Sequence, residues 1–277
     1  MASSERQKAS LPDLLNKQRL AEQGHLEVGS QRLEYRLWPG SPDKPLILLL
    51  HEGLGSVALW RDFPAALAAA TGCSVFAYSR AGYGGSSACV LPRPLSYMED
   101  EARHTLPFLL KELPAKQLIL LGHSDGASIA AVSAGVAADP RLRGLILLAP
   151  HFFTEQVSVT AITATREAYE TGDLRRRLAR YHGENVDCAF EGWADSWLHP
   201  DFRRWDLRTY LPTIQVPTLV IQGEGDEYGT AAHVETAASL IPGRVDTHLL
   251  PSCGHAPQTD QRERVLRLVS GFLGSLG

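Results

Sequence analysis

A strand-to-helix junction around Ser124 constrains the fold of this chain more than any other feature. Apolar residues at 118–121 suit a buried strand, and small residues from 126 to 131 suit a tightly packed helix. Ser124 lies between them in a G-x-S-x-G pattern, with Gly122 before it and Gly126 after it. A sharp turn with a strained serine at its apex leaves no space for Cβ atoms at the two glycines. The pattern predicts that Ser124 projects from the turn as a nucleophile, beside the free N–H groups of a helix N-terminus.

Short apolar segments alternate with helical segments along most of the chain. We expect buried strands at 45–50, 73–78, 118–121, 145–148 and 218–221, an antiparallel strand at 31–38 and a last strand at 245–250. Helices are expected at 11–22, 63–70, 99–113, 231–240 and 261–272. This alternation predicts an α/β fold, with a mostly parallel sheet and helices on both faces.

The alternation stops at Pro150 and resumes at Thr218. Residues 151–210 are rich in Arg, Trp, Phe and Tyr, and they contain no run that suits a buried strand. We therefore expect an N-terminal extension with a short helix at 1–24. The core is expected to consist of 25–150 and 211–277, with a helical cap inserted at 151–210.

Composition excludes several kinds of partner. The 277 residues include 27 basic and 31 acidic side chains, spread along the chain with a net charge of −4, so we expect no nucleic-acid surface. No apolar stretch is long enough to span a membrane, and the N-terminus lacks an apolar signal segment. Four cysteines form no C-x-x-C pair, which predicts reduced thiols: Cys73, Cys89, Cys188 and Cys253. A cytoplasmic protein that acts on a small molecule is expected, and its oligomeric state stays open.

A serine hydroxyl needs a base, and the base needs a carboxylate that orients it. His255 lies in the loop after the last strand, and Asp226 lies in the loop after the strand that resumes the sheet. Loops after parallel strands open at one edge of a sheet, so Ser124 and these two side chains can converge there. Three other carboxylates could take the acidic role: Glu155, Glu224 and Glu227. The spacing favours Asp226, and His123 is expected to be a packing residue.

The order Ser, Asp, His and two further segments resemble the α/β-hydrolase superfamily. Residues 51–56 and Trp60 are similar to the segment that supplies one oxyanion-hole donor, although Glu52 stands where glycine is usual. Residues 79–86 are similar to a structural loop of the family, with Ser79 in place of its usual aspartate. The resemblance implies a helical cap inserted after the sixth strand, and it implies that the N–H groups of Gly53 and Asp125 hold the oxyanion. It gives no reason for a carboxylate side chain at position 52 or 125.

The expected cap is rich in aromatic residues, some of which should line the substrate pocket. The pocket residues expected are Leu54, His151, Phe152, Trp193 and Trp197. An arginine cluster at 175–180 has two interpretations, either a solvated helix face or a clamp for an anionic group of the substrate.

The motifs together predict a serine hydrolase that cleaves a small to medium carboxylic ester or lactone through an acyl-enzyme. Cleavage of a thioester, or of a carbon–carbon bond in a diketone, uses the same residues and stays open. A protein of another class, a ligand receptor with single-turnover chemistry, is the further alternative. His51 and Glu52 begin a zinc motif, but position 55 is glycine, and the glycine run at 82–87 lacks a third spaced glycine. We therefore expect no metal, nucleotide or flavin.

Overall fold

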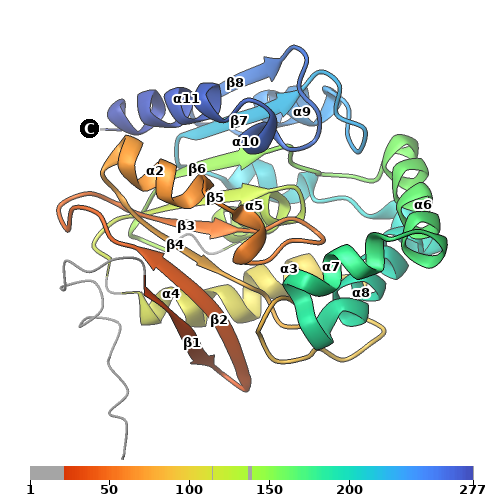
Figure 1. Cartoon of the computed structure of the whole chain (residues 1–277). Helices are drawn as coiled ribbons and strands as arrows, with labels where there is room; N and C mark the ends of the chain where they lie inside the picture. The colour runs from red at the N-terminus through yellow and green to blue at the C-terminus, as the bar shows by residue number, and fades with distance from the viewer. Residues whose placement is uncertain (1–21, 114, 137–138, 277) are drawn as a thin grey trace, which may run out of the picture.

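The computed structural model describes residues 22–113, 115–136 and 139–276. Eight strands in this part of the chain form one sheet in the order β1-β2-β4-β3-β5-β6-β7-β8 (Figure 1). Their bounds are β1 (Glu22–Val28), β2 (Gln31–Trp38), β3 (Leu46–Leu50), β4 (Ser74–Tyr78), β5 (Leu118–His123), β6 (Leu142–Leu148), β7 (Thr218–Gly223) and β8 (Val245–Leu250).

The sheet is parallel from β4 to β8, and β1 and β2 add an antiparallel hairpin at one edge. Parallel pairing brings the carboxyl ends of these strands to one edge of the sheet. Strand β1 includes Glu22 to Gly24, which the sequence assigns to the N-terminal extension and which here belong to the sheet. Of the helix expected at 11–22, only Glu22 is described, and it lies in β1; the rest of that helix falls outside the described residues.

The central strands are buried on both faces, as their continuous apolar sequences predict. In β3, Leu46, Leu48 and Leu50 belong to one hydrophobic cluster, and Ile47 and Leu49 belong to the other. The first cluster packs under α3 (Tyr97–Asp100), α4 (Leu106–Glu112), α5 (Asp125–Val136) and α9 (Ala232–Leu240). The second packs under η1 (Ala58–Trp60), α2 (Phe63–Thr71) and α11 (Arg262–Gly274). Helices therefore cover both faces of the mostly parallel sheet, as the alternation of segments predicts.

The helix expected at 99–113 begins earlier and changes its winding. Between α3 and α4 lies a π-helical turn, η2 (Glu101–Thr105), which ends two residues before Pro107. Proline has no N–H to donate to the preceding turn, and a wider turn accommodates that loss.

The chain between β6 and β7 is helical and is called here the helical insertion (151–217). Its elements are α6 (Gln156–Thr171), α7 (Leu174–His182), η3 (Gly183–Asn185), α8 (Val186–Leu198), η4 (Pro200–Arg204) and η5 (Arg208–Thr213). Figure 1 shows α6, α7 and α8 beyond the edge to which the parallel strands point. The insertion thus stands over the edge at which Ser124 emerges.

A disulfide joins the helical insertion to the core, which corrects the expectation of four reduced thiols. It links Cys89, in the loop after β4, to Cys188 in α8. The two cysteines are separated by 99 positions, so their proximity depends on the tertiary fold and no local spacing indicates it. Cys73 and Cys253 are buried free thiols. No helix in the described ranges has both the length and the apolar character needed to cross a membrane.

Candidate active site

Ser124 occupies the sharp turn between β5 and α5. Its φ is 53°, a left-handed value that is rare for a residue with a side chain. A Cβ atom on Gly122 would lie 2.2 Å from the carbonyl oxygen of Gly126, and one on Gly126 would lie 2.0 Å from that of Leu50. Both glycines are therefore required by the close approach of the strand and the helix.

Ser124, His255 and Asp226 form a hydrogen-bonded relay. Nδ1 of His255 lies 2.8 Å from Oδ1 of Asp226, and its Nε2 lies 2.9 Å from Oγ of Ser124. An ionised carboxylate only accepts hydrogen bonds, so Nδ1 carries the proton and Nε2 accepts from the serine hydroxyl. This is the tautomer that a general base for Ser124 requires.

The carboxylate of Asp226 is fixed by its own loop. Its Oδ1 accepts from the backbone N–H groups of Tyr228 (2.8 Å) and Gly229 (3.2 Å), and Oδ2 accepts from Nε2 of Gln222 (3.1 Å). Burial alone would raise the pKa of Asp226, but the hydrogen bond and charge of His255 and the Tyr228 N–H outweigh it and hold this pKa at about 2. Asp226 therefore stays ionised at neutral pH.

The alternative carboxylates do not reach His255. Glu155 instead accepts from the N–H (2.8 Å) and the hydroxyl (2.7 Å) of Thr230, and it lies 3.0 Å from Nε2 of the buried His233. It thus ties the start of the helical insertion to the loop after β7. In the described chain, neither Glu224 nor Glu227 makes a side-chain hydrogen bond to His255.

The cavity above Ser124 has a volume of about 110 Å³. Four of the five expected pocket residues line it: Leu54, His151, Trp193 and Trp197. Phe152 does not line it, which corrects that expectation. Successive side chains leaving β6 point in opposite directions, so His151 faces the cavity while the fully buried Phe152 packs into the core.

The arginine cluster of the helical insertion does not reach this cavity. Arg175 pairs with Asp187 (2.6 Å), and Arg176 and Arg177 pair with Asp173 (3.3 Å each), all at exposed positions. No arginine or lysine among the described residues lines the cavity. The interpretation as a solvated helix face therefore holds, and the clamp for an anionic substrate finds no support.

A family model of the alpha/beta hydrolase family matches residues 47–268. This chain belongs to that family. The serine hydrolase BPHL of Mus musculus is 25% identical over 206 residues, which cover 72% of this chain and 69% of that protein. The enol-lactonase from Burkholderia xenovorans LB400 superposes with a TM-score of 0.69 at 23% identity, covering 91% of this chain and 100% of that one. A thermophilic esterase from Thermogutta terrifontis superposes with a TM-score of 0.68 at 20% identity, and the match covers 92% of this chain and 99% of that one. Because both solved structures are less than 25% identical to this chain, their similarity shows the fold alone.

In this α/β hydrolase, Glu52 replaces the usual glycine without opening the loop. The carbonyl oxygen of Glu52 accepts from Nδ1 of His51 (2.8 Å), from the Arg80 guanidinium (3.1 Å) and from the N–H of Gly55 (3.0 Å). Its side chain extends toward His123, with Oε2 3.5 Å from Nδ1. Burial would raise the pKa of Glu52, but the hydrogen bond and charge of His123 lower it below its ordinary value.

His123 has a structural role, as expected, but it contacts the catalytic loop. Its Nε2 donates to the carbonyl oxygen of His255 (2.7 Å), and its Nδ1 lies 3.0 Å from the amide nitrogen of Gln258. The residue beside Ser124 thus helps to fix the backbone that carries the base.

In the loop at 79–86, a glutamate from another strand takes the place of the family's usual aspartate. Oγ of Ser79 donates to Oε2 of Glu34 in β2 (2.7 Å), and the same oxygen accepts from the N–H of Gly85 (3.0 Å). Oγ of Ser79 also accepts from the N–H of Val57 (2.9 Å). Glu34 therefore supplies the carboxylate that Ser79 lacks.

The side chain of Asp125 holds the helical insertion, a role that sequence reasoning missed. Its Oδ2 accepts from the hydroxyl of Tyr97 (2.5 Å), and its Oδ1 accepts from the indole N–H of Trp197 (3.2 Å). Burial raises the pKa of this carboxyl, against the opposite effects of Arg80, Tyr97 and Trp197. Asp125 is fully buried, and both oxygens of its side chain are bonded within this polar network.

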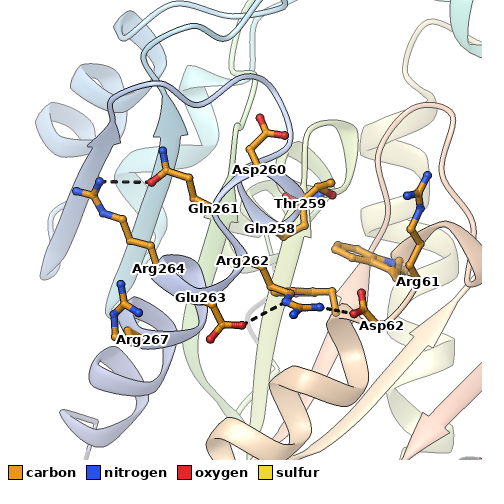
Figure 2. A pocket seen from close by; sticks show the side chains of 12 residues that line it. Arg61, Asp62, Gln258, Thr259, Asp260, Gln261, Arg262, Glu263, Arg264 and Arg267 are labelled. Atoms are coloured by element: carbon orange, nitrogen blue, oxygen red, sulfur yellow. Dashed lines mark hydrogen bonds and ion pairs between the residues drawn. The ribbon is translucent and has the colours of Figure 1, made fainter.

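A wider cleft of about 600 Å³ lies elsewhere, between α2, α10 (Pro257–Asp260) and α11. Figure 2 shows Arg262 crossing it to Asp62 and Glu263, with Arg264 and Arg267 nearby on α11. Its lining is mostly charged and includes no hydrogen-bonded nucleophile and base. The hydrogen-bonded relay lies at the smaller cavity and not in this cleft.

Among the described residues, no group of three or more His, Cys, Asp or Glu side chains is arranged to hold a metal ion.

Proposed function

We propose that this α/β hydrolase cleaves a small carboxylic ester or lactone through an acyl-enzyme on Ser124. The observation that carries the proposal is the relay Ser124, His255 and Asp226 at a strained turn beneath a small, mostly apolar cavity. A serine held this way is a nucleophile with its base already in place.

The reaction would run in two halves. Oγ of Ser124 attacks the carbonyl carbon while Nε2 of His255 takes its proton, and the same proton then leaves with the alcohol as the acyl-enzyme forms. A water molecule, deprotonated by His255, attacks the acyl-enzyme and releases the acid. Asp226 stabilises the imidazolium formed in each half.

The N–H groups of Gly53 and Asp125 would hold the oxyanion. Both residues line the cavity beside Ser124, and no hydrogen bond from either N–H to another described residue is found. Asp125 is also the first residue of α5, where N–H groups have no partner within the helix. Loss of one such donor costs about 100- to 1,000-fold in turnover in a comparable site.

The cavity favours a compact, uncharged substrate. Its apolar lining includes Leu54, Ile162, Trp193 and Trp197, and the volume of about 110 Å³ suits a short acyl group. Glu52 also lines the cavity, and no arginine or lysine among the described residues does, so a negatively charged substrate would find no opposite charge there.

Steady-state hydrolysis of p-nitrophenyl esters from acetate to octanoate tests the proposal. We expect many turnovers per enzyme, a maximum at short acyl chains, and no measurable activity in Ser124→Ala. A stoichiometric burst without turnover would favour a receptor, while a thioester or a diketone cleaved far faster than any ester or lactone would reassign the substrate class.

A further inference from the structure

One buried histidine at the active-site cavity is not used by the catalytic relay. His151 follows β6, is 2% exposed and lines the cavity above Ser124. Its ring centre lies 5.5 Å from that of His255. It is therefore close enough to the reacting atoms to touch a substrate.

The ring of His151 is held firmly by its surroundings. It packs edge-on against Trp197 from α8 (5.2 Å between centres) and against His233 from α9 (5.2 Å). Its carbonyl oxygen accepts from Oγ of Ser128 (2.6 Å), which fixes the backbone. On a further side, Gly229 approaches so closely that a Cβ there would lie 3.0 Å from Cε1 of the ring.

The hydrogen-bonding capacity of this ring is unused by the protein. Nδ1 is buried and has no partner, and across 22–113, 115–136 and 139–276 no hydrogen bond to Nε2 is found either. Nδ1 is sealed from solvent, so the ring nitrogen that a substrate could reach is Nε2, which lies at the cavity lining without a partner from the described part of the protein.

The ring offers this capacity without a charge. Burial lowers the pKa of His151 well below its ordinary value, and repulsion by His233 and His255 lowers it further. A neutral imidazole has one donor and one acceptor. It therefore suits a hydroxyl or carbonyl group better than a carboxylate or phosphate.

We propose that His151 is a specificity-determining residue that hydrogen-bonds an uncharged hydroxyl or carbonyl group of the substrate, next to the ester that Ser124 attacks. The natural substrate class would then be a short hydroxyacyl or oxoacyl ester, or the corresponding lactone. This inference rests on the proposed esterase function.

The chain offers a matched polar control. Ser158 also lines the cavity, but its hydroxyl already donates to the carbonyl oxygen of Tyr228 (2.6 Å). The hydroxyl of Ser158 is thus satisfied by the protein, whereas the ring of His151 is not.

Hydrolysis of matched p-nitrophenyl esters tests the inference: butyrate, 2-hydroxybutyrate, 3-hydroxybutyrate and 3-oxobutyrate. We expect the wild type to prefer at least one polar ester over butyrate by roughly 10- to 100-fold in kcat/KM. His151→Leu should abolish that preference, measured as the ratio of kcat/KM for the polar ester to kcat/KM for butyrate in the same variant, because the hydrogen bond is lost and the volume is kept. His151→Gln should recover part of the preference, and Ser158→Ala should leave the ratio unchanged.

The outcomes separate this inference from the proposed function. Equal hydrolysis of all four esters by the wild type, or an unchanged ratio in folded His151→Leu, overturns the role of His151 while the esterase stands. If the wild type hydrolyses no ester or lactone, the proposed function falls and this inference falls with it. Thermal unfolding of each variant verifies that it is folded, and His151→Gln serves as the test if the leucine variant is not.

Discussion

The indole N–H of Trp197, in the helical insertion, lies 3.2 Å from Oδ1 of Asp125, the residue that follows Ser124. Tyr97 completes this contact, because its hydroxyl donates to the other carboxylate oxygen and also receives the indole N–H at 3.1 Å. The side chain of Asp125 therefore joins the turn at Ser124 to α8 of the helical insertion.

Removal of this contact should destabilise the protein and loosen the insertion. We expect Trp197→Phe to cost about 1–2 kcal/mol of unfolding free energy, because it removes a hydrogen bond to a charged group. Asp125→Ala should cost about 3 kcal/mol or more, since it leaves the buried Tyr97 hydroxyl without an acceptor and removes one of the two acceptors of the Trp197 indole. Urea unfolding of both variants measures these losses. Equal stability of wild type and Asp125→Ala would mean that the network does not hold the insertion.

Variants of Asp226 and Glu155 can show which of these two carboxylates orients His255 and which only supports the structure. Asp226→Asn should lower kcat by about 10⁴, because the base would be held in the wrong tautomer. Glu155→Gln is the matched control and should leave kcat within a few-fold, since Glu155 contacts Thr230 and His233 and not His255. Comparison of the two variants on one ester checks the assignment. If Glu155→Gln lowered kcat more than Asp226→Asn does, Glu155 and not Asp226 would be the residue that orients the base.

Glu155 should also contribute a pH-dependent part of the stability. Burial would raise its pKa, but the contacts with His233 and Thr230 lower it to about 2, whereas an unfolded glutamate has a pKa of about 4.3. A group with a depressed folded pKa stabilises the fold above its unfolded pKa and loses that effect as pH falls toward the folded pKa. The stability gap between wild type and Glu155→Gln should therefore be widest above pH 5 and narrow steadily toward pH 3. Urea midpoints across this range measure the gap, and a gap that widens toward acid would contradict the assignment.

The effects of substitutions at Gly53 and Trp193 on kcat/KM are expected to be coupled. A Cβ at position 53 would lie 2.2 Å from Nε1 of Trp193, so Gly53→Ala must displace the indole or the oxyanion loop. We expect Gly53→Ala to lower kcat/KM by roughly 10- to 100-fold in the wild type and by far less in Trp193→Ala. A double-mutant cycle on one ester measures this coupling. Additive effects would show that the clash does not matter for catalysis.

The disulfide predicts a thiol count. Protein denatured without a reductant should show two titratable thiols, from Cys73 and Cys253, and four after reduction. Replacement of both Cys89 and Cys188 by serine should cost about 2–4 kcal/mol, because the bridge closes a long loop. Four thiols before reduction would contradict the bond and support the reduced state that the cysteine spacing predicts.

Much of the fold and the relay follows from local sequence. The segments 46–50 and 118–121 are apolar throughout, as expected of strands that are covered on both faces. The glycines beside Ser124 identify the turn, and parallel strands bring the loops of Asp226 and His255 to the same edge. These predictions succeed because each depends on periodicity, on steric crowding or on strand direction.

The remainder depends on contacts between distant segments. Strand β1 is mostly polar and half-buried, so its pairing with β2 leaves no apolar signal. Glu34 and Ser79 are 45 positions apart, and Tyr97 and Trp197 are 100 apart. Phe152 was misplaced because periodicity does not show which of two adjacent side chains faces a cavity. An unsatisfied histidine such as His151 becomes visible only when its neighbours are known.

The acyl-enzyme itself provides the most direct test of the central claim. Wild-type protein mixed with excess p-nitrophenyl butyrate and quenched in acid should carry one butyryl group, and peptide mass analysis should place it on Ser124. Ser124→Ala should carry none and should lose on the order of a million-fold in turnover. A butyryl group on another residue, or undiminished ester hydrolysis by Ser124→Ala, would contradict the account.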